Sequence, residues 1–247
     1  GTLNVTANGG SIAYQHWGES GESWGTINLN GGRLIAGNIY SGRGSSLGHA
    51  VFNFNGGVLQ PNGGDLLHDI EAAYVKSGGA IIEFTGNSTT IRQALLDGGG
   101  GGGLSVIGNG IANGGEGNDG NMLILPNYNN TFTGDIAVTN GAHIRIGDGN
   151  GNTGDGMLGS STNILLDNGG IKNNNDSDPV LGPSRTITLG NGGGYFPVGW
   201  GDSSLPVQGQ ITGSGALYVN RAGGDLALTR PATEYKGKTR IAAAGPR

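Results

Sequence analysis

The sequence predicts an all-β protein that folds as a parallel β-helix, a solenoid of roughly ten coils. Three observations support this prediction: a very high glycine content, repeats of about 23–25 residues, and short strands with alternating apolar residues. Gly accounts for 55 of 247 residues, whereas average usage is roughly 7%. Each Gly in a helix interior costs roughly 1 kcal/mol relative to Ala, so this density excludes a mostly helical protein.

The remaining composition narrows the class further. Gly follows no every-third pattern and Pro occurs only 8 times, which excludes collagen. A net charge of −5 disfavours binding to nucleic acid, and no apolar run is long enough to predict a membrane-spanning helix. The absence of Cys excludes disulfides and thiolate metal sites, and it fits a bacterial protein that is secreted or displayed on the cell surface.

A short repeat defines the expected coil. Residues 27–34 resemble residues 52–59, and residues 164–171 resemble residues 187–193. Each copy is an alternating strand, a turn rich in Asn and Gly, and a second short strand. Asn and Gly tolerate a positive φ, so they are expected at sharp corners, where Asn side chains can stack into hydrogen-bonded ladders.

An Asn-Gly turn could also close a β-hairpin, which would give an antiparallel sandwich. The repeat length, the strands of three to five residues, and the consistently apolar inward positions favour a coil of parallel strands. In such a coil each turn buries its apolar residues only by stacking on its neighbours. The expected inward residues are Leu29, Leu34, Phe54, Leu59, Leu123, Leu125, Val138, Ile144, Ile146, Leu226 and Leu228.

A longer repeat has an offset of 103 residues. Its first copy contains Leu123, Leu125, Phe132, Gly134 and Val138; these recur as Leu226, Leu228, Tyr235, Gly237 and Ile241. Five apolar, aromatic or glycine positions at identical spacing are unlikely to arise by chance and indicate a genuine repeat.

Several of these segments carry a family resemblance. Residues 73–82, 98–106, 122–146 and above all 224–241 resemble the passenger-associated, autotransporter-associated β-strand repeats of large secreted bacterial proteins. The shared pattern is a Gly-rich lead-in, Leu-x-Leu, an Asn/Thr loop, an aromatic residue, x-Gly and a further strand. The resemblance implies a right-handed parallel β-helix, an extracellular or cell-surface location, and a structural or adhesive role with surface glycans among its partners.

We expect one β-helix domain over residues 1–247, as a segment of a longer chain. Residues 65–73 contain good helix formers and predict a short helical excursion from the coil. Gly-rich loops are expected at 97–103 and 108–121.

Candidate chemistry is sparse. The densest group of titratable residues is Asp65, His68, Asp69 and Glu71, which a carbohydrate-binding or polysaccharide-cleaving β-helix could use. The four histidines have no metal-binding spacing, and His143 is expected at the surface. We therefore assign no catalytic, cofactor-binding or metal-ligating residue, and we expect a non-enzymatic protein without a cofactor.

Charge is distributed unevenly along the chain. Residues 221–247 carry 6 basic and 2 acidic side chains, a net charge of +4, whereas residues 1–220 carry 7 and 16, a net charge of −9. The terminal coils of a β-helix present unpaired strand edges. We expect these coils to stack on further coils of a longer chain, or head to tail on another copy as a filament.

Overall fold

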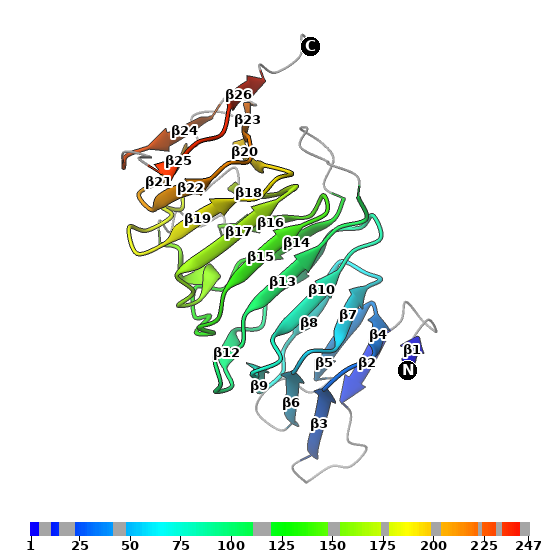
Figure 1. The fold of residues 1–247 in the computed structure, drawn as a ribbon. Helices are drawn as coiled ribbons and strands as arrows, with labels where there is room; N and C mark the ends of the chain where they lie inside the picture. Colours follow the sequence, from blue (N-terminus) through cyan, green and yellow to red (C-terminus); the bar gives the residue numbers. More distant parts are fainter. Residues whose placement is uncertain are drawn as a thin grey trace.

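The computed structural model describes residues 1–4, 11–14, 23–41, 48–110, 120–147, 154–173, 178–198, 204–221, 224–230 and 234–242. Over these residues the protein is a parallel β-helix, as expected (Figure 1). All strand pairs between the described elements are parallel. The antiparallel sandwich is therefore excluded.

Two ten-stranded sheets run along the solenoid. Sheet A contains, in spatial order, β1 (Thr2–Asn4), β4 (Arg33–Ala36), β7 (Val58–Pro61), β10 (Ala80–Glu83), β13 (Leu104–Ile107), β15 (Ile136–Thr139), β17 (Asn163–Asp167), β19 (Thr186–Leu189), β22 (Gln210–Gly213) and β25 (Glu234–Tyr235). Sheet B contains β2 (Ser11–Tyr14), β5 (Asn38–Ser41), β8 (Asp65–His68), β11 (Thr89–Ile91), β14 (Met122–Leu125), β16 (His143–Ile146), β18 (Gly169–Asn173), β20 (Gly194–Val198), β23 (Leu217–Arg221) and β26 (Thr239–Ala242).

The third side of the solenoid is less regular. Sheet C covers the first coils with β3 (Ser23–Leu29), β6 (Gly48–Phe54), β9 (Ala72–Val75) and β12 (Leu95–Asp97). Sheet D covers the last coils with β21 (Ser204–Val207) and β24 (Asp225–Leu228). Between them, the described residues form loops and the short 3₁₀ helix η2 (Gly156–Leu158).

The solenoid makes about eight turns, slightly fewer than the ten expected. Each long sheet contains ten strands, but the two outermost strands of sheet A are short: β1 has three residues and β25 has two. The two ends of the chain lie at opposite ends of the solenoid (Figure 1).

The short repeats are confirmed as successive coils. Ile27 pairs with Phe52 and Leu34 with Leu59, so the 25-residue offset places equivalent residues directly beside one another. Ile164 pairs with Ile187 at an offset of 23 residues. An Asn ladder also forms on the third side. Asn53 Nδ2 donates to Asn28 Oδ1 at 2.8 Å, and Asn55 Nδ2 donates to Asn30 Oδ1 at 3.0 Å.

The inward residues form one continuous core along the solenoid. Nine of the eleven expected inward residues are buried, namely Leu29, Leu34, Phe54, Leu59, Leu123, Leu125, Val138, Ile144 and Ile146. The other two also face inwards, beside the buried Leu205 and Val207, but they are less covered: Leu226 is partly buried and Leu228 is 45% exposed. Both lie on β24, the outermost strand of sheet D, which has a neighbouring strand on one side only.

The two copies of the 103-residue repeat do not lie in the same sheets of the solenoid. Leu123 lies on β14 in sheet B, whereas its counterpart Leu226 lies on β24 in sheet D. Val138 lies in sheet A, whereas Ile241 lies in sheet B and is 73% exposed. The two copies therefore lie on different sides of the solenoid. The spacing from β24 to β26 equals that from β14 to β15, but the second copy forms the additional strand β25, in sheet A, between them.

Residues 65–73 are not a helical excursion. They form β8, a corner, and the start of β9, and β8 pairs with β5 and β11 within sheet B. Leu66 and Leu67 are fully buried in this arrangement. Packing between coils therefore overrides the local helix propensity, which is a weak preference in comparison.

The Gly-rich loop at 97–103 is ordered against its neighbours. Gly98 N–H donates to Val75 O at 2.9 Å, and Gly102 O accepts from Gly134 N–H at 3.0 Å. A Cβ on Gly102 would overlap the carbonyl oxygen of Lys76, so the backbone at this position passes too close to the preceding coil for a side chain. The second expected loop lies at 108–121, but its residues 111–119 are outside the described ranges.

Candidate functional site

The residues Asp65, His68, Asp69 and Glu71 lie at the corner where sheet B turns into the third side of the solenoid. Asp65 and His68 are the first and last residues of β8. Asp69 forms the corner itself with a φ of 50°, and Glu71 immediately precedes β9. Because this segment is a strand and a turn, its polar side chains are exposed on the outside of the coil. We call these four residues, with His49 and Tyr40, the corner cluster.

Two histidine–carboxylate pairs form within the corner cluster. His68 Nδ1 lies 2.9 Å from Asp69 Oδ2, and His49 Nδ1 lies 3.0 Å from Glu71 Oε2. His49 is on β6, so the second pair bridges neighbouring coils. A carboxylate that accepts from Nδ1–H orients the ring and leaves Nε2 as an acceptor.

The ring of Tyr40 on β5 stacks on the ring of His68, with centroids 5.4 Å apart and an interplanar angle of 8°. Asp65 is engaged elsewhere, because its Oδ1 accepts from Arg92 Nε at 3.2 Å. The Asp69 side chain is the most exposed of the corner carboxylates, at 71%. The corner thus combines an aromatic surface, imidazole nitrogens and an accessible carboxylate, which are the groups that bind sugar hydroxyls.

The corner cluster has no metal-centre geometry. In the described ranges, no three His, Asp or Glu side chains lie close enough together to hold a metal ion. Asp178 lies outside the corner cluster, where its Oδ1 accepts a hydrogen bond at 2.6 Å from the N–H of Ser204, the first residue of β21. The residues brought together at the corner are therefore suited to hydrogen bonding with a ligand.

A buried ion pair on the third side was not anticipated from the sequence. Arg185 is 4% exposed and its Nε donates to Asp155 Oδ2. Its other nitrogens donate to carbonyl oxygens of Asp155, Gly159 and Ser161. The pair joins η2 to the segment before β19. No sequence signal indicated it, because the partners are 30 residues apart and match no repeat.

His143 is also buried, contrary to the expectation of a surface residue. Its side chain points outwards from β16 but is 4% exposed, since the ring leans over Gly170 on the next strand. Burial, with a smaller contribution from the charge of Lys172, lowers the pKa of His143 from 6.5 to about 4, against an opposing hydrogen bond to the backbone of Gly141. The imidazole is therefore neutral at pH 7.

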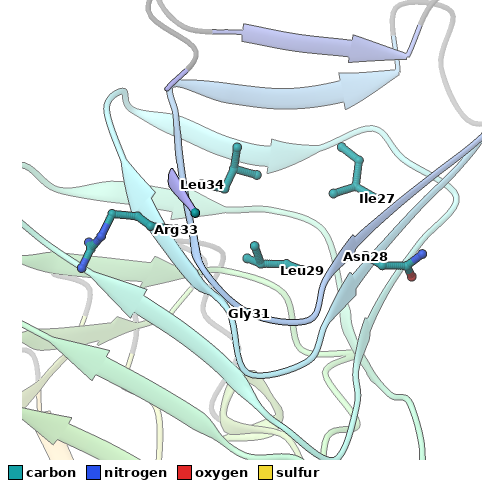
Figure 2. Close-up of a pocket in the computed structure, with 7 residues that line it drawn as sticks. Ile27, Asn28, Leu29, Gly31, Arg33 and Leu34 are labelled. Atoms are coloured by element: carbon teal, nitrogen blue, oxygen red, sulfur yellow. The ribbon is translucent and has the colours of Figure 1, made fainter. Parts of the chain in front are cut away.

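Two apolar hollows mark the ends of the described solenoid. The first has a volume of about 360 Å³ and lies beside β3 and β4. Figure 2 shows Ile27, Leu29 and Leu34 pointing into it, while Asn28 and Arg33 point outwards on either side. The second hollow, of about 210 Å³, is lined by Leu217, Val219, Gly224, Asp225, Leu226, Leu228, Thr239 and Ile241. Both hollows continue the line of the inner core.

No protein-family model, curated protein or solved structure matches this chain. Across the part of the chain that the structure describes, no helix combines the length and hydropathy needed to cross a membrane.

Proposed function

We propose that this chain is a non-enzymatic structural module, a rod segment of a secreted or surface-displayed bacterial protein with an adhesive role. The observation that supports this proposal best is the continuous apolar core, which the inward residues of both ten-stranded sheets form along the solenoid. The resemblance to autotransporter-associated repeats favours the same role and an extracellular location.

The contacts between coils suit a load-bearing rod. Successive strands pair backbone to backbone, and the Asn ladder and the Arg33 side chain add bonds between coils on the outside. Arg33 Nη1 donates to Gln60 Oε1 and Nη2 donates to Glu83 Oε2, both at 2.8 Å, so one side chain links three successive strands of sheet A. The strength of such a rod is distributed over many neighbour contacts.

The two end hollows favour stacking of coils at both ends of the rod. Leu228 and Ile241 line the second hollow and are 45% and 73% exposed, which is unusual for large aliphatic side chains in a β-helix core. A further coil would cover them, whether it comes from a longer chain or from a second copy. The charge difference between residues 221–247 and the rest of the chain favours head-to-tail contact between copies.

Sedimentation velocity of the purified chain over a hundredfold concentration range tests stacking between copies. We expect linear oligomers that grow with concentration and shrink with added salt. Ile241→Lys and Leu228→Lys should suppress them. Leu165→Lys is the matched control, because Leu165 is 38% exposed but lies on the outer face of sheet A. A monomer at every concentration, or equal suppression by Leu165→Lys, contradicts stacking between copies.

A second function is favoured by the corner cluster, which offers Tyr40, His68 and Asp69 to a carbohydrate. We propose glycan binding there as the alternative, with or without cleavage. Purified protein would be screened against acidic and neutral polysaccharides for binding and for new reducing ends. Binding that is lost in Asp69→Asn and retained in Asp178→Asn supports the glycan site. Turnover that is lost in the same variant would replace the structural proposal by an enzymatic one. No binding to any polysaccharide contradicts the alternative.

A further inference from the structure

The ring of His143 fills a gap that Gly170 leaves in a column of outward-facing residues on sheet B. The column runs through Met122, His143, Gly170, Tyr195 and Tyr218 on successive strands. Strands in a sheet are about 4.8 Å apart, so His143 and Tyr195 start about 9.6 Å apart across Gly170. Their ring centroids are only 6.3 Å apart, with the rings at 63°. Both rings therefore lean into the space that the missing side chain of Gly170 leaves.

The His143 ring fits closely into the space over Gly170. A Cβ on residue 170 would lie 2.5 Å from His143 Cδ2, so the imidazole rests directly on the Gly170 backbone. The far side of Tyr195 is covered by Tyr218, whose ring is stacked on it at 4.5 Å. Among the residues that the structure describes, His143 Nε2 is buried and has no hydrogen-bond partner. The space over Gly170 therefore holds the flat, neutral imidazole ring, and it offers no hydrogen-bond acceptor to an N–H group on Nε2.

Among the residues that the structure describes, the charged side chains on the outer face beside His143 are basic. Lys172 is on the neighbouring strand β18 and Arg145 is on β16 itself, two residues along. The element on the other side, β14, presents Met122, and β20 presents Tyr195. In the described part of this outer face, from β14 to β26, the outward positions hold no carboxylate. A proton on the imidazole would add a buried positive charge beside existing ones.

We propose that protonation of His143 opens the outer face of sheet B between β16 and β20, so that this part of the solenoid is an acid-sensitive latch. The proton goes to an imidazole nitrogen that can reach an acceptor only when the ring leaves its place over Gly170. Swinging the ring out frees Tyr195 and weakens the neighbouring strand pairs. This inference is independent of the proposed structural or glycan-binding function.

The size of the effect follows from the two ionisation constants. His143 has a pKa of about 4 when closed and 6.5 when exposed to water. The closed state is therefore fully favoured above pH 6.5 and loses its advantage as the pH falls from 6.5 towards 4. The ratio of open to closed molecules should rise about 20-fold between pH 7 and pH 5, and level off below about pH 3 at about 240 times its value at pH 7.

Amide hydrogen exchange of the intact chain, corrected for intrinsic exchange rates, measures this ratio. We expect protection of residues 143–146, 169–173 and 194–198 to fall about 20-fold from pH 7 to pH 5. His143→Gln should remove that pH dependence, because an amide does not titrate. His68→Gln, at the exposed corner, should leave it unchanged. Constant protection in the wild type, or the same pH dependence in His143→Gln, overturns the latch.

A second measurement covers the case in which His143→Gln does not fold. The pKa of His143 in the wild-type chain can be read from the pH dependence of its ring proton shift in NMR spectra. A value near 4 supports the latch. A value of 6 or above overturns it, since closure would then impose no cost on the protonated ring.

Discussion

Replacing Asp155 by Ala leaves the buried Arg185 without its counter-ion. The Arg185 guanidinium keeps its bonds to the carbonyl oxygens of Asp155 and Gly159, at 3.0 and 3.1 Å, and its bond to Ser161 O. It loses the carboxylate, which also accepts from Gly182 N–H at 2.8 Å. The substitution therefore strands a positive charge that is 4% exposed and frees a backbone donor.

Removing one partner of a buried pair costs about 3–5 kcal/mol. Since three carbonyl acceptors remain, we expect the lower end, about 3 kcal/mol, and a fall in Tm of about 6–12 °C for a chain of this size. Asp65→Ala is the matched control. It breaks a 3.2 Å pair with Arg92 whose side chains are 46% and 59% exposed, so it should cost less than about 1 kcal/mol.

Urea unfolding followed by circular dichroism gives both free energies of unfolding. The pH dependence adds a second check. Burial raises the pKa of Asp155, but the hydrogen bonds from Arg185 and from Gly182 N–H outweigh it, and the net pKa is below 3.8. The stabilisation is therefore present above pH 3.8 and lost as the pH falls through the folded pKa. Equal losses in Asp155→Ala and Asp65→Ala at pH 7 would refute this reasoning.

Three further predictions concern the packing between coils. Gly102→Ala should destabilise the chain by about 1–3 kcal/mol in urea unfolding, because its Cβ would overlap Lys76 O; Gly64→Ala, which has open space around it, should have no measurable effect. Leu125→Asp places a charge in the core, where Leu125 is fully buried, and should abolish cooperative unfolding at 25 °C, whereas Leu125→Ala should cost about 2–5 kcal/mol. Asn53→Ala breaks the Asn28–Asn53 bond and should cost about 1 kcal/mol, measured against an Asn191→Ala control at an exposed turn.

The coil architecture could be predicted because it is repeated. Ile27 and Phe52 share a register that is visible as a 25-residue offset in the sequence, and the structure pairs them directly. The inward positions followed from strict alternation within each strand, which is why Leu59 and Leu125 were assigned correctly. Leu228 also faces inwards but is 45% exposed, because alternation gives the direction of a side chain and not whether a neighbouring coil covers it.

The buried polar residues could not be predicted in the same way. His143 is buried because Gly170 leaves room for its ring, and Arg185 is buried because Asp155 lies opposite. Both contacts join coils at separations of 27 and 30 residues that depend on loop length. Four of the six residues of the corner cluster are close together in the sequence, at 65–71, and could be predicted as a group. His49 and Tyr40 could not, because only the stacking of coils brings them to this corner.

In a parallel β-helix, equivalent residues of successive coils lie in one straight column, one strand spacing apart. On the outer face of sheet A this column passes through Val58, Ile81, Ser105, Ala137, Leu165, Thr188 and Thr212. The chain has no native Cys, so nitroxide spin labels can be attached to single Cys pairs without other changes. Pulsed electron–electron double resonance then measures the distance between the two labels of each pair. The parallel β-helix predicts a backbone separation of about 19 Å for Ser105 with Thr212 and about 29 Å for Val58 with Thr212, because these pairs are four and six strand-to-strand steps of about 4.8 Å apart. Distances that do not increase with the number of intervening strands would contradict it.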